Sequence, residues 1–413
     1  MAKFPWKKHN RNSMMEAVAL CAVGAEKIVS NELRKLELKV IESGFGKIRF
    51  NAELEGLYRA LMGLRAADRV LLEIAFFEAL DFDALFEGVR QQAWEEYIPP
   101  KMGLRVVKVR SNRSKLAAET SIQAVVHKAA AERLCIKRGI SRLPEPSKEK
   151  FSSQYHDEAE LRIYVEKDRV SVLLDLSGEP LFKRKYRSRG GEAPLRETTA
   201  AAIILHSGWR RKFPLYDPFC GSGTIAIEAA MYAWNIAPGI GRHFALEQLL
   251  PGDKKTERKV REEYLQKVDF THLVRIGGSD SESGIIAAAN TNMEQAVALG
   301  MNALGQGEGS HNDKRPSFMP LFEVLPMEKA DPKDMTEGFI ITNPPYGRRL
   351  GDAESAERTY AEMEQLARHF PGWKLALITD HPGFESFFGK KADSCREITN
   401  GAIRSYLYQY EKL

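Results

Sequence analysis

The feature that most constrains the fold of this chain is a pair of glycines between a short apolar strand and an apolar helix. The segment 215–226 reads LYDPFCGSGTIA, and the apolar helical pattern continues to residue 233. Gly221 and Gly223 allow a tight turn and a close approach to a ligand, and the free amides at a helix start attract an anionic group. The pattern predicts a ligand-binding loop; a purely structural strand-to-helix turn is the alternative.

Strand and helix patterns alternate after this loop, which is typical of a parallel sheet. The candidate strands are residues 215–216, 273–277, 318–324, 339–342 and 374–378. The chain then carries two alternating runs, 396–399 and 402–410, separated by Asn400-Gly401, a strong hairpin signal. The second half of the chain is therefore predicted to be an α/β domain whose parallel sheet ends in an antiparallel hairpin. Residues 238–271 read as a charged helical insertion.

The first half of the chain shows a mixed α+β pattern. Short strands flank a helical stretch at residues 25–36, and a basic strand pattern covers residues 104–110. Two further strands, 160–166 and 169–175, are joined by a Lys167-Asp168 turn. These patterns predict two small α+β units, the second with a basic face.

Basic residues gather in two places although the net charge is only +5. Six lie between residues 101 and 115 without an acid, and six more lie in the Gly- and Pro-containing linker 179–196. A charge run is usually a solvated face, but two such clusters favour contacts with the phosphates of a nucleic acid. The candidate RNA-binding residues are Lys108, Arg110, Arg113, Lys115, Lys183, Arg184 and Arg187.

Composition excludes several other classes of protein. The 413 residues are 43% hydrophobic and 28% charged, which is typical of a folded protein. No apolar run approaches the ~18 residues that cross a bilayer, and the first residues lack a signal-peptide pattern. The four cysteines are too scattered for a disulfide framework or a CxxC metal pair. We therefore expect a cytoplasmic protein without a membrane partner.

Two acids narrow the ligand of the glycine loop. Asp217 would repel the pyrophosphate of a dinucleotide, but it suits a cationic ligand such as the methionine portion of S-adenosylmethionine. Asp280 follows the next candidate strand, where a carboxylate can accept both hydrogens of a ribose diol. The alternative for Asp280 is a helix N-cap before residues 283–299.

A rigid corner follows the fourth candidate strand, in the run FIITNPPYG at residues 339–347. The exocyclic amine of a nucleobase is a poor nucleophile because its lone pair is delocalised into the ring. The side-chain oxygen of Asn343 and the carbonyl of Pro344 could accept both amine hydrogens, and Tyr346 could stack on an extruded base. A simple Asn-Pro-Pro turn is the alternative. The corner predicts methyl transfer to a nucleobase amine.

With these motifs in place, the chain resembles the class I S-adenosylmethionine-dependent nucleic-acid amino-methyltransferases. The segments 185–198, 217–223, 278–281 and 343–347 are similar to those of the THUMP-containing RNA guanine-N2 methyltransferases, especially the bacterial enzymes that make N2-methylguanosine in 23S ribosomal RNA. The resemblance implies a ferredoxin-like domain at 1–64, a THUMP RNA-binding domain at 65–178, a basic linker at 179–196 and a Rossmann-like methyltransferase domain at 197–413.

The resemblance also implies roles for individual residues. The cofactor S-adenosylmethionine would contact one set of positions: Thr198, Asp217, Phe219, Gly221, Ser222, Gly223, Asp280 and Ser281. The catalytic corner would comprise Asn343, Pro344, Pro345 and Tyr346. The acid that the family usually places near the adenine is missing from FEVLPM at 322–327, where Glu328 is the candidate substitute.

Several alternatives stay open from the sequence. No set of metal ligands is visible, so we expect a reaction without a metal ion. The substrate could be 23S ribosomal RNA or its assembly precursor, or tRNA guanine, or an adenine N6 amine, because the corner does not discriminate between the two bases. A catalytically silent RNA-binding or assembly protein is a further alternative, and a dehydrogenase is a remote one. No obligate protein partner is evident.

Overall fold

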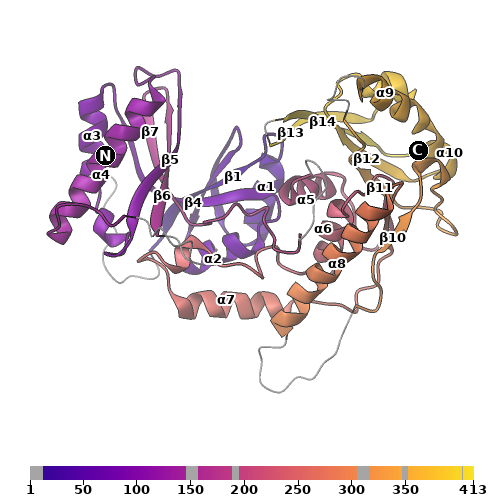
Figure 1. Cartoon of the computed structure of the whole chain (residues 1–413), viewed down its shortest axis with the longest axis horizontal. Helices are drawn as coiled ribbons and strands as arrows, with labels where there is room; N and C mark the ends of the chain where they lie inside the picture. Colours follow the sequence, from indigo (N-terminus) through magenta and orange to yellow (C-terminus); the bar gives the residue numbers. More distant parts are fainter. Residues whose placement is uncertain (1–12, 146–156, 188–194, 305–315, 347–351, 402) are drawn as a thin grey trace.

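The computed structural model describes residues 13–145, 157–187, 195–304, 316–346, 352–401 and 403–413 (Figure 1). Two seven-stranded sheets organise these residues, one in each half of the chain. Figure 1 shows the N-terminal sheet, in indigo to magenta, from the left to the middle of the view, and the labelled strands of the C-terminal sheet, in orange to yellow, on the right. None of the helices in the described part of the chain is both long and apolar enough to span a bilayer.

The chain begins with a ferredoxin-like βαββαβ unit. Its elements are β1 (Met15–Cys21), α1 (Glu26–Lys35), β2 (Lys39–Gly44), β3 (Lys47–Ala52), α2 (Leu54–Gly63) and β4 (Ala67–Glu78). The strands pair antiparallel in the order β2-β3-β1-β4. The fourth strand of this unit therefore lies beyond residue 64, inside the region predicted to be the THUMP domain.

The same sheet continues from β4 through three more strands. The added elements are α3 (Phe82–Arg90), β5 (Gly103–Asn112), α4 (Glu119–Arg138), β6 (Glu158–Glu166) and β7 (Arg169–Asp175). β7 pairs antiparallel with β4 and β6, and β5 pairs parallel with β6. Both residues of the predicted turn, Lys167 and Asp168, have positive φ. One sheet thus crosses residue 64, and the THUMP boundaries stay a prediction.

The C-terminal sheet has the order β10-β9-β8-β11-β12-β14-β13. Its strands are β8 (Leu215–Asp217), β9 (Ile276–Asp280), β10 (Leu321–Val324), β11 (Phe339–Thr342), β12 (Lys374–Thr379), β13 (Ser394–Asn400) and β14 (Ile403–Tyr410). The first five in this order pair parallel, and β14 pairs antiparallel with β12 and β13, which confirms the predicted parallel sheet and hairpin.

One strand lies later in the chain than expected. The strand expected at residues 273–277 is β9, where Ile276 faces Leu215 of β8 and the strand ends at Asp280. Leu273 is instead 67% exposed. Asp280 is therefore the last residue of a strand rather than part of the following loop.

Helices cover the sheets and carry most of the core. The C-terminal half contains α5 (Glu197–His206), α6 (Thr224–Ala233), α7 (Lys254–Gln266), α8 (Ser283–Leu304), α9 (Asp352–Glu362), α10 (Glu364–His369) and α11 (Phe384–Phe388), and short 3-10 helices occur at Trp94–Glu96, Ala245–Glu247 and Met327–Lys329. One apolar cluster runs through both halves of the chain, from Met15 to Leu407. A second cluster surrounds Tyr360 and Trp373 near the C-terminus.

The charged insertion of the C-terminal half joins the two halves. Its helix α7 packs on α2, where Lys259 Nζ lies 2.7 Å from a Glu55 carboxylate oxygen and Arg59 lies 3.0 Å from Glu263. The buried Arg65 donates to the Ile236 carbonyl at 2.7 Å, near the end of α6. The ferredoxin-like unit is therefore fixed against the sheet that carries the predicted site.

Candidate active site

The glycine loop lies between β8 and α6, as the sequence predicts. Gly221 and Gly223 have φ values of +52° and +83°, in the left-handed region that favours glycine. A Cβ on Gly223 would also come within 3.0 Å of the Phe322 ring. The loop thus needs both glycines for its path, and it brings the amino end of α6 to the carboxyl edge of the sheet.

Asp217 lies at the end of β8 and is fully buried. Its Oδ1 accepts hydrogen bonds from Thr342 Oγ1 at 2.6 Å and from the Phe219 amide at 3.1 Å. Burial raises the pKa of Asp217 to about 7, and the Asp280 carboxylate adds to the rise. A buried carboxyl with this pKa is poised to become ionised when a cation binds beside it.

Asp280 lies at the end of the neighbouring strand β9. Its Oδ2 accepts from the Gly221 amide and its Oδ1 from the Glu282 amide, each at 3.1 Å. The side chain therefore stabilises both the glycine loop and the turn into α8. Because each carboxylate oxygen has a further lone pair, these bonds leave acceptor capacity for the predicted ribose hydroxyls.

A cavity of about 420 Å³ opens between these strand ends. Among the predicted cofactor-binding and catalytic residues, its lining includes Asp217, Phe219, Gly221, Ser222, Asp280, Ser281, Asn343 and Pro345. The lining also includes residues that sequence reasoning missed: Leu195, Cys220, Thr224, Ile225, Glu282, Ile285 and Thr359. Several of these follow directly on a motif residue, which is the signal that could have found them.

Four predicted residues do not line the cavity. Thr198 is buried and donates to Asp68 Oδ1 at 2.5 Å, so it joins α5 to the ferredoxin-like unit. Gly223 shapes the loop from behind, next to Phe322. Pro344 is buried and Tyr346 is half-buried beside Asn343. These positions support the cavity wall or corner instead of forming the lining itself.

The corner after β11 is held by two tyrosines. The Tyr346 hydroxyl donates to Asn343 Oδ1 at 2.7 Å, and the Tyr360 hydroxyl donates to the Pro345 carbonyl at 3.2 Å. Tyr360 also bonds Thr379 of β12 at 2.9 Å. The corner is thereby fixed to the next strand, and one lone pair of the Asn343 oxygen is in use.

The bond from Thr342 to Asp217 joins the two parts of the site. Thr342 ends β11 and Asp217 ends β8, and the two strands are hydrogen-bonded neighbours in the sheet. Asn343 is the next residue after Thr342, and it lines the same cavity as Asp217 and Asp280. A ligand in this cavity would therefore lie beside the corner.

The polar groups around the cavity fit S-adenosylmethionine. Asp217 and Asp280 can accept hydrogens from an ammonium group and from ribose hydroxyls, and the start of α6 can receive a carboxylate. The volume lies within the range of about 300–1,000 Å³ that small-molecule sites occupy. Glu328, the candidate substitute near the adenine, is exposed and is absent from the lining residues of this cavity.

The predicted RNA-binding residues differ in exposure. Arg110, Arg113, Lys115 and Lys183 are exposed, and Lys108 is half-buried on β5. Arg187 keeps only 16% of its side chain exposed and pairs with Glu197 at 2.8 Å. Among the exposed members, Arg110 pairs with Glu119 at 2.8 Å and Lys183 pairs with Glu179 at 3.2 Å. The role of the exposed members in RNA binding stays a prediction.

Arg184 is the most buried member of this set. Its side chain is 1% exposed, and it pairs with Glu228 of α6 at 3.4 Å while donating to the Leu181 carbonyl at 2.8 Å. Its guanidinium also bonds the Arg65 carbonyl. This burial and pairing count against the prediction that Arg184 contacts RNA, because its guanidinium is already used inside the junction of the two halves.

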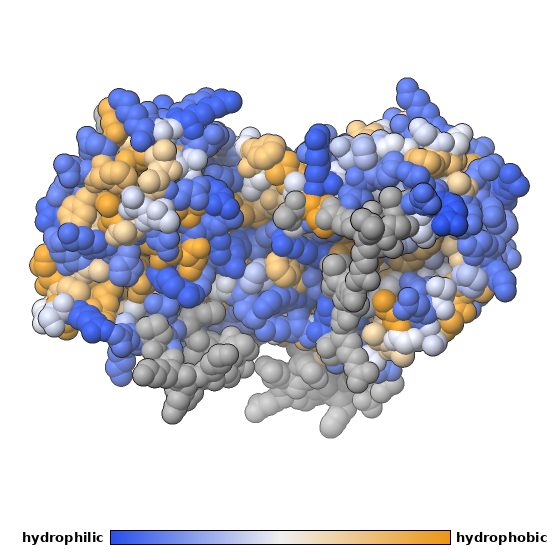
Figure 2. Space-filling view, turned by 45° about the horizontal axis from the view of Figure 1, so that its top comes forward, coloured by the Kyte–Doolittle hydropathy of each residue, from blue (hydrophilic) through white to orange (hydrophobic). Residues whose placement is uncertain are grey.

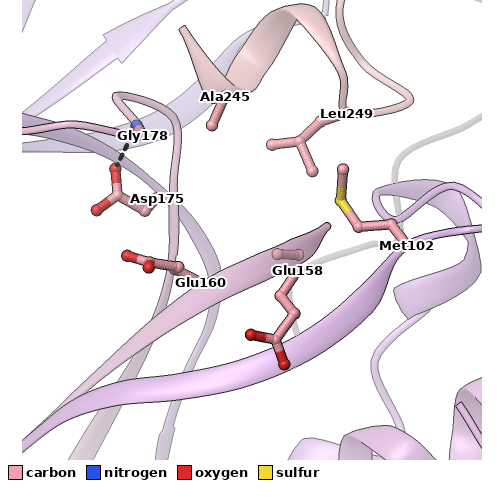
Figure 3. Close-up of a pocket in the computed structure, with 8 residues that line it drawn as sticks. Met102, Glu158, Glu160, Asp175, Gly178, Ala245 and Leu249 are labelled. Carbon is pink, nitrogen blue, oxygen red and sulfur yellow. Dashed lines mark hydrogen bonds between the residues drawn. The ribbon is translucent and has the colours of Figure 1, made fainter. Parts of the chain in front are cut away.

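A second, smaller cavity carries three carboxylates but no free charge (Figure 3). Glu160 lies 2.8 Å from Arg105, and Glu158 lies 3.4 Å from the same guanidinium. Asp175 pairs with Arg69 at 2.5 Å and accepts from the Gly178 amide at 3.3 Å. These acids form structural ion pairs within the N-terminal sheet, and the segment 245–249 adds the apolar side chains of Ala245 and Leu249 to the lining.

Comparison with known proteins agrees with this site. A family model described as an RMKL-like methyltransferase domain matches residues 184–314 and 321–409, and a model of the RlmL ferredoxin-like domain matches residues 16–71. YpsC of Bacillus subtilis strain 168, a candidate RNA methyltransferase, is 34% identical over 95% of each chain. The ribosomal RNA large subunit methyltransferase K/L of Cellvibrio japonicus is 31% identical over 95% of this chain. The chain spans about half the length of that relative, 50% of it.

Solved structures are similar over nearly the full length. A candidate methylase from Clostridium difficile 630 has a TM-score of 0.84 at 34% identity, covering 97% of this chain and 99% of its own. SMU.472, a candidate methyltransferase in complex with SAH, has a TM-score of 0.82 at 32% identity, with the same coverage. SAH is the demethylated form of S-adenosylmethionine, so the predicted cofactor class and methyltransferase fold are confirmed at the level of the family. The chain belongs to the RMKL-like methyltransferase family.

Proposed function

We propose that this protein transfers a methyl group from S-adenosylmethionine to the exocyclic N2 amine of a guanine in 23S ribosomal RNA. The observation that carries the proposal is the position of Asn343, which lines the same cavity as Asp217 and Asp280. An acceptor for an amine thus lies next to the groups that suit the cofactor. The N-terminal half, with the region 65–178 as a THUMP domain, would dock the RNA.

The residues on the cofactor side of the cavity would bind and orient S-adenosylmethionine. Asp217 would hold the ammonium group as a carboxylate, Asp280 would hold the ribose, and the amides of the glycine loop would receive the methionine carboxylate. When bound, S-adenosylmethionine supplies an electrophilic methyl group on a positively charged sulfur. Phe219 and Ile285 give this side apolar walls that exclude water from a reactive group.

The corner acts on the amine. Asn343 Oδ1 keeps a second lone pair besides the one that meets Tyr346, so it can accept an amine hydrogen. A second acceptor at the Pro344 carbonyl would favour a pyramidal nitrogen and stabilise the positive charge that develops on it. The corner would hold the amine in place while its nitrogen takes the methyl group that S-adenosylmethionine supplies. The proton then leaves to water because an alkylated arylammonium is strongly acidic.

Relatives support RNA as the substrate. Those named K/L act, by name, on the RNA of the large ribosomal subunit, and YpsC is named for RNA. A specific observation favours a second candidate, the N6 amine of adenine. A structure from Listeria monocytogenes, 33% identical with a TM-score of 0.82, is described as a predicted N6-adenine-specific DNA methylase. Guanine in tRNA is the remaining substrate that the corner would accept.

The test is nucleoside analysis after methylation in vitro. The protein is incubated with isotopically labelled S-adenosylmethionine and either undermethylated ribosomal RNA or bulk tRNA, and the digested nucleosides are separated by mass spectrometry. We expect label in N2-methylguanosine from the 23S RNA. Label in N6-methyladenosine, or in tRNA alone, would overturn the guanine or the ribosomal assignment.

A silent RNA-binding protein is distinguished by calorimetry. Binding of S-adenosylmethionine, with heat that is lost in Asp217→Asn, supports an enzyme. No heat at adequate protein concentration favours the silent protein.

All four cysteines are free thiols, which suits the reducing cytoplasm where ribosomes assemble.

A further inference from the structure

The linker between the two halves contains a cavity of about 390 Å³ that the cofactor does not account for. Its lining carries five cations, Lys183, Arg184, Lys185, Arg187 and Arg196, with Phe182, Leu195 and the single acid Glu197. Leu195 also lines the cofactor cavity, so the two cavities are neighbours.

Arg187 lies between the two cavities with one donor unused. Its Nε donates to Glu197 at 2.8 Å, and its Nη2 donates to Thr224 Oγ1 at 2.9 Å and to the Leu195 carbonyl at 3.1 Å. Its Nη1 is buried and has no hydrogen-bond partner among the described residues. A buried, unpartnered guanidinium donor is costly unless an acceptor arrives, so this atom points to an anionic ligand.

The two exposed lysines of the cavity share one carboxylate. Lys183 lies 3.2 Å from Glu179, and Lys185 contacts the other oxygen of the same side chain. Lys185 also has a φ of +76°, a strained conformation for a non-glycine residue that directs its side chain to this place. One carboxylate neutralises only one of the two lysines, which leaves positive charge at the mouth of the cavity.

Arg196 connects the cavity with the catalytic corner. Its guanidinium lies 4.8 Å from the centre of the Phe182 ring, and it is 3.6 Å from Asp68, beyond hydrogen-bond distance. It also packs on Gly401 at the tip of the β13–β14 hairpin, where a Cβ would come within 3.2 Å of Nη2. The adjacent residue, Asn400, lies beside the Tyr346 hydroxyl. A continuous row of contacts therefore runs from the corner to the linker cavity.

We propose that the linker cavity binds a phosphate of the RNA backbone close to the nucleotide whose base enters the Asn343 corner. The proposal rests on RNA being the substrate. Arg187 Nη1, Lys183 and Lys185 would supply charge-assisted donors, and Arg196 would present its fork beside the Phe182 ring. The phosphate would thereby fix the register of the strand, and the cofactor would be held by a separate set of residues.

The test compares RNA and cofactor affinities of linker variants. The variants are K183A/K185A and R196A, and the matched control is R258A, an exposed cation on α7 that pairs with Glu262. Binding of a fluorescein-labelled single-stranded RNA is followed by anisotropy as a function of KCl, and binding of S-adenosylmethionine by calorimetry. Thermal melting checks that each variant is folded.

We expect K183A/K185A to weaken RNA binding about tenfold at low salt, with a smaller salt slope, and R196A to raise the KM for RNA while kcat stays the same. Cofactor affinity should match that of R258A. Unchanged RNA affinity in both variants would overturn the proposal. An equal loss of cofactor affinity would show that these cations bind the methionine carboxylate of the cofactor instead of an RNA phosphate, and would also overturn the proposal. Wild-type RNA binding without methylation would contradict the proposed function but leave the phosphate site standing.

Discussion

The two seven-stranded sheets of this protein use the same number of strands for different tasks. In the C-terminal sheet, parallel strands β8, β9 and β11 end at one edge, so residues far apart in sequence meet in one cavity. In the N-terminal sheet only β5 and β6 are parallel, and the loops lie at both ends. A parallel sheet concentrates chemistry at an edge, whereas an antiparallel sheet offers a surface whose function depends on charge.

Figure 2 shows hydrophilic residues over most of one face, with apolar residues scattered in small groups among them. In the N-terminal sheet we assign no single residue a chemical role like that proposed for Asn343 in the C-terminal half. Substitutions in the two sheets should therefore act on different measured quantities.

The largest expected effect is on the chemical step. Asn343→Ala removes an acceptor that stabilises charge developing on the amine, and such losses lower kcat by about 100- to 1,000-fold. The affinity for S-adenosylmethionine, measured by calorimetry, should stay nearly intact. An equal loss of cofactor affinity would show that Asn343 shapes the cavity instead of acting on the amine.

Asp217 should make cofactor binding depend on pH. Its carboxyl, with a pKa of about 7 in the free protein, must lose its proton to hold an ammonium group. The Kd for S-adenosylmethionine should therefore rise about tenfold per pH unit below 7 and level off above it. Asp217→Asn should bind weakly and without this dependence. Titration calorimetry between pH 5.5 and 8.5, in buffers of different ionisation heat, would also detect the released proton.

The same carboxyl has an effect of known sign on stability. Because its folded-state pKa lies above the ordinary value of 3.8, the unfolded chain binds fewer protons between these two pH values. The contribution of Asp217 to the free energy of unfolding therefore falls as pH rises from about 4 to 7. In Asp217→Asn this component should be absent from denaturant titrations, and an unchanged pH profile would contradict the burial argument.

The N-terminal sheet should contribute docking alone. Replacing Lys108, Arg110 and Arg113 by alanine should weaken RNA binding several-fold and lower the slope of log Kd against log salt by about 2. The cofactor Kd and the single-turnover rate at saturating RNA should stay the same. An unchanged salt slope would move the docking surface away from β5.

The smallest expected effect is at Tyr346. Tyr346→Phe removes the hydroxyl that donates to Asn343 Oδ1 while keeping the ring for stacking. A neutral hydrogen bond is worth about 1 kcal/mol, so kcat should change by less than about tenfold. Tyr346→Ala should cost more if the ring stacks on the base. Equal rates for the two variants would remove stacking from the account.

More of the C-terminal half than of the N-terminal half could be predicted from the sequence, for physical reasons. The glycine loop, Asp217, Asp280 and the corner are local patterns whose chemistry can be read from a few adjacent residues. The edge strand β2 was missed because its residues are almost all exposed and show no alternation. The continuous sheet across β4 depends on long-range pairing with β7, which no local pattern records.

The burial of charged side chains was the other feature that could not be predicted from the sequence. Arg184 lies in a basic run and was predicted to meet RNA, but its partner Glu228 stands 44 residues later on α6. Thr198 likewise faces Asp68 in the other half of the chain. Neither pairing has a signature in the neighbouring residues, so the sequence alone could not separate structural cations from docking ones.

A crystal structure with S-adenosylmethionine bound tests the central claim most directly. We expect the ammonium group at Asp217, the ribose at Asp280, and the sulfonium methyl group directed at the space in front of Asn343. A methyl group directed away from that residue, or a cofactor bound outside this cavity, would contradict the account.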